Sequence, residues 1–140
     1  MDGVTLDLIK TQQGAVLRKS LETLYTSLFR NPQCLPDYLS DTCVQHVGRL
    51  ALSYTEILEH VRHLRRLMRQ IDYSVVDAIA SGDTIADRHI VRLTLNDARS
   101  VALEVLCILH VEHGKIVAVY ESSQVIEGDE ALGVLATATQ

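Results

Sequence analysis

The sequence predicts one α+β domain spanning residues 1–140, in which helices come first and an antiparallel sheet follows. Apolar residues recur at helical spacing in the first half of the chain, and the period changes to two after Asp72. No strand-helix-strand alternation interrupts this order, so the helices should cover one face of the sheet. A chain of 140 residues with 47% hydrophobic content is long enough to bury one core.

The first predicted helix runs from Ile9 to Arg30 and should bury one face. Its apolar stripe recurs at steps of three and four residues and consists of Leu17, Leu21, Leu24 and Leu28. Pro32 and Pro36 then break the pattern and allow only a short second helix around residues 36–39. The ends of the chain, residues 1–8 and 128–140, are expected to be flexible.

A third helix should begin near Tyr54, after a short strand around residues 43–47. Ser53 and Glu56 have the spacing of a capping box, and the residues flanking them have that of a hydrophobic staple. The basic residues on the far side of this helix are typical of a solvated helix face rather than a binding patch.

The second half of the chain predicts an antiparallel meander. β-rich runs cover residues 73–80, 84–95, 100–113 and 115–126. The segments between them, "SGD", "NDAR" and "HG", have the composition and length of hairpin turns.

Alternation along the last strand predicts a carboxylate in apolar surroundings. Glu121 shares one face with Val117, Val119, Ser123 and Val125, whereas Ile116, Ala118 and Tyr120 lie on the other. If the valine face lies toward the helices, desolvation disfavours the charged form of Glu121 and makes it a candidate acid or base. The alternative is an ion pair with Arg88 or Arg92 across the sheet.

Charge and cysteine content restrict the partners and the compartment. A net charge of −5 argues against nucleic-acid binding, because phosphate recognition requires an excess of Lys and Arg. The three cysteines show no metal-like spacing and favour a reducing compartment, and the acidic N-terminus does not have the charge of a signal peptide. No apolar run is long enough to cross a bilayer. We therefore expect a cytoplasmic protein with no membrane partner.

The six histidines do not predict a metal site. The sequence contains no HxH, HExxH or CxxC motif. His60 and His63 are expected on a solvated helix face, and His110 and His113 near a turn. No phosphate-binding glycine loop is present either, so we expect neither a metal nor a cofactor.

The element order and three short motifs, "VQH", "IADRH" and "GKIVAVYE", resemble the nuclear transport factor 2-like superfamily. Within it, the resemblance is to the SnoaL-like polyketide cyclase group and, more distantly, to ketosteroid isomerase, and it spans residues 9–125. It implies a cone-shaped domain with about three N-terminal helices packed in the concave face of a strongly curved, mostly antiparallel sheet. It also implies an apolar pocket at the open end and a homodimer through the outer sheet face.

The resemblance implies roles for three residues. The cyclases carry their base just after the aromatic residue of the "GKI" strand, where Glu121 follows Tyr120 here, although Asp is usual there. The isomerases place a carboxylate base near the end of the first strand, where His46 stands, and an oxyanion-binding tyrosine in the first helix, where Tyr25 is the nearest match. Their second oxyanion donor would fall near Leu106 or Cys107, and neither residue can replace it.

The predicted site therefore has Glu121, His46 and Tyr25 as catalytic candidates. Its expected pocket residues are Gln45, Tyr54, Arg88, Cys107 and Val119. Two structural alternatives remain open: His46 is a buried histidine bonded to backbone or to Tyr25, and Tyr25 is a core aromatic.

Two functions fit this site. The first is proton transfer on a small, largely apolar carbonyl compound by a cofactor-independent isomerase, cyclase or related lyase. The second is a non-catalytic ligand-binding or dimerisation domain.

Overall fold

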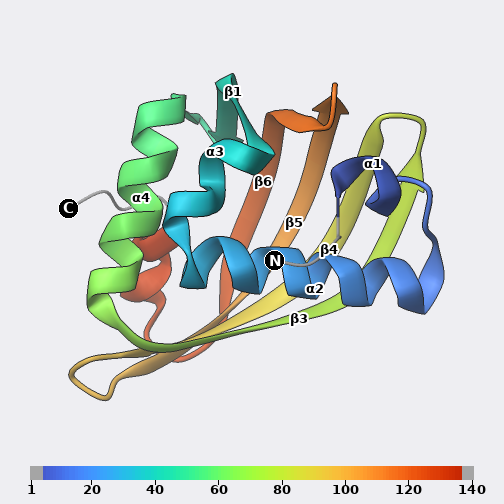
Figure 1. Ribbon diagram of the computed structural model, residues 1–140. Coiled ribbons are helices and arrows are strands. Elements are labelled where there is room, and N and C mark those ends of the chain that lie inside the picture. The colour runs from blue at the N-terminus through green and yellow to red at the C-terminus, as the bar shows by residue number, and fades with distance from the viewer. Residues whose placement is uncertain (1–4, 137–140) are drawn as a thin grey trace.

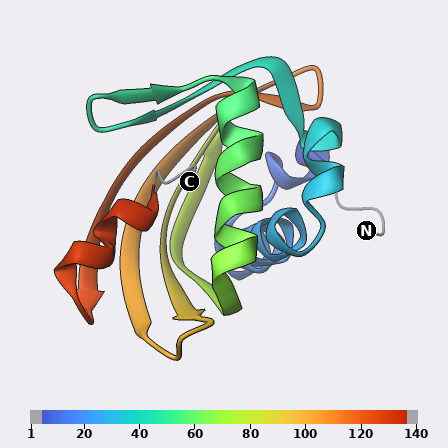
Figure 2. The same ribbon diagram turned by 90° about the vertical axis from the view of Figure 1, so that its left-hand side faces the viewer.

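A computed structural model describes residues 5–136 and confirms the α+β prediction (Figure 1). The helices pack in the concave face of a strongly curved sheet, as Figure 2 shows from the side. The elements in chain order are α1 (Leu6–Ile9), α2 (Gly14–Arg30), η1 (Pro32–Cys34), α3 (Leu35–Tyr38), β1 (Leu39–Val47), β2 (Leu50–Leu52), α4 (Tyr54–Leu67), β3 (Met68–Ser81), β4 (Thr84–Leu95), β5 (Ser100–Glu112), β6 (Lys115–Glu127) and η2 (Glu130–Ala136).

The sheet has six strands in the order β2-β1-β6-β5-β4-β3. The strands from β3 to β6 form the predicted antiparallel meander. His113 and Gly114 both have positive φ in the β5–β6 turn, as a tight hairpin requires. β1 instead runs parallel to β6. This pairing brings the "VQH" strand beside the "GKIVAVYE" strand.

Register shifts interrupt the ladders and change which face a side chain takes. One shift separates His110 from Val111 in the β5–β6 ladder, and another lies between Leu39 and Val44 in the β1–β6 ladder. As a result Ile116 and Val119 are both buried, so the prediction that Ile116 faces away from Val119 is wrong. A β-bulge adds one residue to a strand and shifts the alternation beyond it. Along the rest of β6, Val119, Glu121 and Ser123 share one face, as predicted, and this face lies toward the helices.

The first predicted helix is two helices in the structure. α1 ends at Ile9, and α2 starts at Gly14 after Gln13, whose side-chain amide donates to the Ala80 carbonyl at 2.6 Å. This contact fixes the start of α2 on β3. The predicted stripe is confirmed: its first three leucines are fully buried, and Leu28 is partly buried against the same core.

α4 begins with the predicted capping box. The Ser53 hydroxyl accepts from the Glu56 amide at 3.3 Å, and the Glu56 carboxylate accepts from the Ser53 amide at 3.0 Å. The helix ends at Leu67, and β3 follows at once, so this strand starts earlier than the predicted Tyr73.

The prediction that the α4 histidines lie on a solvated face is wrong. His60 and His63 are only 7% and 9% exposed. His60 lies three positions after Ile57, which places both on the same side of the helix, and α4 turns this side toward the sheet.

The described parts of the two chain ends contribute to the core. Leu6 and Ile9 of α1 and Leu132 and Leu135 of η2 are all buried. η2 packs against β6 (Figure 2). The remaining parts of the expected flexible ends, residues 1–4 and 137–140, lie outside the described residues. No helix within residues 5–136 has the length and apolarity needed to span a membrane.

Candidate active site

A cavity of about 190 Å³ lies between the helices and the concave face of the sheet. We call it the inner cavity. Its walls are mostly Leu, Ile and Val side chains of α2, α4 and β3 to β6, and Leu135 of η2 borders it on one side. Polar groups reach it from several of these elements, and the ones used below are Tyr25, Gln45, Tyr73, His89, Cys107 and Glu121. An apolar cavity with a few convergent polar groups is typical of a small-molecule site.

Glu121 is the carboxyl group that β6 presents to this cavity. Burial raises the pKa of Glu121 above its ordinary value, and the nearby Asp87 carboxylate raises it further. The charge of His89 and a hydrogen bond with the Gln45 side chain act in the opposite direction without cancelling the effect. A carboxyl with a raised pKa is a stronger base than an exposed glutamate once it is ionised.

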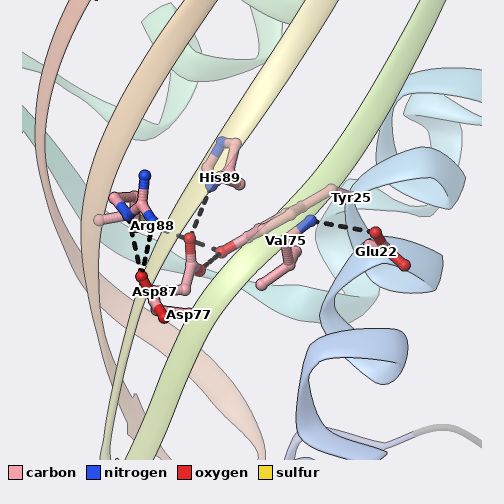
Figure 3. A network of polar contacts seen from close by, with 8 residues as sticks. Glu22, Tyr25, Val75, Asp77, Asp87, Arg88 and His89 are labelled. Carbon is pink, nitrogen blue, oxygen red and sulfur yellow. Dashed lines mark hydrogen bonds and ion pairs between the residues drawn. The ribbon is translucent and has the colours of Figure 1, made fainter. Parts of the chain in front are cut away.

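Tyr25, Asp87 and His89 form a chain of three polar side chains (Figure 3), of which Tyr25 and His89 line the inner cavity with Glu121. The Tyr25 hydroxyl hydrogen-bonds to Oδ2 of Asp87, and Nδ1 of His89 lies 2.6 Å from Oδ1 of the same carboxylate. The Asp87 side chain is fully enclosed. The Tyr25 and His89 rings are in contact, with centroids 4.8 Å apart. The chain thus links α2 to β4 at the cavity.

The position of Tyr25 depends on where α2 sits on β3. The β3–β4 ladder is irregular between Val75 and Asp77, and there the Val75 amide donates to the Glu22 carboxylate at 3.0 Å (Figure 3). Glu22 lies on α2 one turn before Tyr25. Because this contact fixes the helix along the strand, it also fixes how far the Tyr25 side chain reaches toward β4.

Cys107 separates the two carboxylates of the site. Asp87 pairs with Cys107 across β4 and β5, and Cys107 pairs with Glu121 across β5 and β6, so the three form one row on the concave face. Burial raises the pKa of the Cys107 thiol, and both carboxylates add to this effect. A thiol held protonated in this way is a poor nucleophile. Its sulfur lies 4.0 Å from the Tyr25 hydroxyl oxygen.

The structure brings five of the predicted site residues to the inner cavity. They are Tyr25, Gln45, Cys107, Val119 and Glu121. Tyr54 does not line it, because it lies in the first turn of α4, where it packs partly buried against the core.

His46 lies on the other face of the sheet, which we call the outer face. Its ring stacks on Tyr120, with centroids 4.5 Å apart and planes 8° from parallel. The two residues are partners in the parallel β1–β6 register, and partners share a face. Gln45, the neighbour that alternation places opposite His46, therefore reaches the inner cavity. His46 and Glu121 both border an open pocket on the outer face, but the expectation that His46 lines the inner cavity with Glu121 is wrong, and so is the alternative bond from His46 to Tyr25.

Arg88 also lies on the outer face. It forms ion pairs with Asp77 at 2.9 Å and with Glu104 at 3.2 Å. Arg92 pairs with Glu127 at 2.9 Å. The alternative in which Glu121 pairs with one of these arginines is therefore wrong.

Three residues of the site were not predicted as functional: Tyr73, Asp87 and His89. Asp87 and His89 belong to the "IADRH" motif and share the buried face of β4 with Val91 and the leucines after it. Alternation alone places them together. A polar pair at alternate positions on an otherwise apolar strand face was the available signal. The described residues contain no group of three His, Cys, Asp or Glu side chains placed to hold a metal ion.

The comparisons with known proteins agree with this architecture. The family model of the SnoaL-like domain matches residues 30–119, which is more than half of the chain. A search of the curated proteins gave no match.

Solved structures show the same fold at low sequence identity. IdmH, a candidate polyketide cyclase from Streptomyces antibioticus, is 18% identical with a TM-score of 0.61, over 71% of this chain and 86% of that one. PrhC from Penicillium brasilianum is 12% identical with a TM-score of 0.67, over 86% and 83%. An NTF2-like protein of unknown function from Burkholderia pseudomallei is 20% identical with a TM-score of 0.58, over 81% and 92%. The chain belongs to the SnoaL-like domain family and has the NTF2-like cone fold.

Proposed function

We propose that the inner cavity binds a small, largely apolar carbonyl compound and that Glu121 moves a proton next to its carbonyl group. The reaction is a cofactor-independent step of the isomerase or cyclase type. One observation carries the proposal: the Glu121 carboxyl faces an apolar cavity, where burial raises its pKa. A general base works best when its pKa lies near the operating pH. The raised pKa of Glu121 is closer to neutral pH than that of an exposed glutamate, so the shift favours this role.

The surroundings of Glu121 suit this chemistry. Apolar walls exclude water and leave a carbonyl compound as a better occupant than a charged one. The Gln45 amide holds the carboxyl by a hydrogen bond. The Tyr73 phenol lines the same cavity, and burial raises its pKa, so it stays protonated and can donate a hydrogen bond. The similarity of the fold to that of IdmH supports the same class of reaction.

Hydrogen exchange in a simple ketone tests the proposal. We use 2-tetralone, an apolar bicyclic ketone, in D2O and follow the loss of its α-hydrogens by proton NMR. The protein should accelerate this exchange, and Glu121→Gln should abolish the acceleration. Glu104→Gln is the matched control, because Glu104 lies on the outer face in an ion pair with Arg88. Equal acceleration by the parent protein and Glu121→Gln would refute the role of Glu121.

A homodimer through the outer face is our second proposal. Leu106, Ile108 and Tyr120 lie there with 52%, 42% and 45% of their surface exposed. They come from the adjacent strands β5 and β6, where Ile108 and Tyr120 are direct partners. Contiguous exposed apolar side chains on a sheet face are typical of an interface, and a second copy of the chain offers the same surface in return.

A further inference from the structure

The chain of Tyr25, Asp87 and His89 has no role if Glu121 transfers the proton unaided, yet two of its members, Tyr25 and His89, line the same cavity as Glu121. Its carboxylate is fully enclosed, and each of its two oxygens has a partner. A buried carboxylate that accepts hydrogen bonds at both oxygens is held in one orientation. The Tyr25 hydroxyl and the His89 ring, which are hydrogen-bonded to Asp87, are therefore held in one orientation as well.

The protons of this chain can be counted. A tyrosine has one O–H, and an ionised carboxylate only accepts. The Tyr25 hydroxyl therefore donates its one hydrogen bond to Asp87 and has no hydrogen left to donate to the oxygen of a ligand. For the same reason Nδ1 of His89 carries the proton that bonds to Asp87. The oxyanion-donor role expected of Tyr25 does not fit this arrangement.

The remaining ring nitrogen of His89 is the group that the chain offers to a ligand. Figure 3 shows the second nitrogen, Nε2, on the side of the ring that points away from Asp87. The ring lines the inner cavity, and its charge acts on the Glu121 carboxyl. In the sheet, Asp87 stands in the same row as Glu121, and His89 stands in the next row on the same face.

We propose that His89 is a second catalytic residue, whose Nε2–H binds the carbonyl oxygen of the ligand while Glu121 takes the proton from the adjacent carbon. Asp87 is a positioning residue for His89, and Tyr25 is a positioning residue for Asp87. This inference rests on the proposed function and names the group that activates the carbonyl.

The step balances with these two groups alone. The C–H bond next to the carbonyl breaks, and its proton goes to the Glu121 carboxylate. The electron pair of that bond forms the C=C of an enol, and the carbonyl π pair moves onto oxygen. Oxygen takes the Nε2 proton of the imidazolium, which leaves neutral His89 with its Nδ1 proton on Asp87. Reversal at a different carbon isomerises the compound, and attack of the enol carbon on a second carbonyl closes a ring. The Asp87 carboxylate stabilises the imidazolium and sets the tautomer that follows.

The tautomer of His89 gives a test that needs no turnover. In ¹⁵N NMR of the histidine rings, Nδ1 of His89 should carry a proton in the parent protein both when the ring is neutral and when it is the imidazolium that the step uses, with the signals assigned by their absence in His89→Phe. In Asp87→Asn the side-chain amide can donate to Nδ1, so the neutral ring should carry its proton on Nε2 instead. A neutral parent ring with its proton on Nε2, or an unchanged tautomer in Asp87→Asn, would overturn the proposal.

Binding of 2-naphthol tests the ligand contact. This phenol has the shape of the enol of 2-tetralone, and its fluorescence reports binding. We expect His89→Phe to bind it at least about tenfold more weakly, because a charged hydrogen bond is lost. His46→Phe is the matched control on the outer face and should bind like the parent. Unchanged affinity in His89→Phe, or no binding by the parent, would overturn the proposal.

A third measurement covers the case in which His89→Phe does not fold. In the parent protein, 2-naphthol should shift the Nε2 signal of His89 and leave the Nδ1 proton in place, and absence of that shift would also overturn the proposal.

The experiments distinguish failure of the His89 role from failure of the proposed function. If Glu121→Gln abolishes exchange but His89→Phe binds 2-naphthol as tightly as the parent protein does, only the proposed role of His89 is refuted. If the parent accelerates no exchange, the proposed function is lost.

Discussion

Tyr25 and His89 share one buried carboxylate, that of Asp87, with the phenol on one oxygen and the imidazole on the other. Tyr25 comes from α2 and the other two come from β4, so this contact joins the helical layer to the sheet. It also links stability to the candidate chemistry, because the same atoms that hold the cone together orient a ring in the inner cavity.

Tyr25→Phe should destabilise the protein by about 1–3 kcal/mol, because it leaves one oxygen of a buried carboxylate without a donor. The free energy of unfolding in urea measures this effect. Tyr120→Phe is the matched control: Tyr120 is 45% exposed on the outer face, and its change should stay within about 0.5 kcal/mol. Equal losses in the two variants would show that Asp87 does not depend on the Tyr25 hydroxyl.

Glu121→Gln should make the fold more stable at neutral pH. The folded-state pKa of Glu121 lies above its ordinary value of 4.5, so the folded protein holds this proton more tightly than the unfolded chain does. Stability is therefore lost as the pH rises from 4.5 through the folded pKa, and Gln removes this loss. Urea unfolding at several pH values should show a gain that is absent below pH 4.5 and grows above it. A variant less stable than the parent at neutral pH would contradict this sign.

His46→Asn should leave the exchange of 2-tetralone hydrogens unchanged. His46 stacks on Tyr120 and does not line the inner cavity, where Glu121 is proposed to act. The rate of exchange in D2O measures this directly, with Glu121→Gln as the inactive reference. A large drop in His46→Asn would place the reacting ligand on the outer face instead.

Ile108→Lys should produce a monomer. Ile108 is 42% exposed in the middle of the proposed interface, and a charge there would be buried without a partner in the dimer. Val16→Lys is the matched control, because Val16 is 61% exposed on α2, on the opposite side of the sheet. Sedimentation velocity at micromolar concentration should show a dimer for the parent and the control. A monomeric parent would refute the interface.

The sequence was sufficient to predict the layers of the fold. The capping box at Ser53, the leucine stripe of α2 and the hairpin turns are local signals, and each corresponds to an element in the structure. Alternation also placed Glu121 on one face with Val119 and Ser123, but the structure was needed to show that this face lies toward the helices.

The errors arose where position depends on contacts between distant segments. Alternation separates Gln45 from His46 but does not say which of them faces the helices. The parallel pairing of β1 with β6 decides this, and it places His46 beside Tyr120. The partner of Tyr25 was missed for the same reason, because Asp87 comes within reach only when α2 lies across β3.

Titration of the Glu121 side-chain carboxyl by ¹³C NMR tests the central claim most directly, since it needs neither a substrate nor a variant beyond Glu121→Gln for assignment. The account predicts a midpoint above 4.5, because the carboxyl is buried in an apolar cavity. A midpoint at or below 4.5 would mean a solvated or cation-paired carboxylate, and would contradict its role as the acid-base group of the inner cavity.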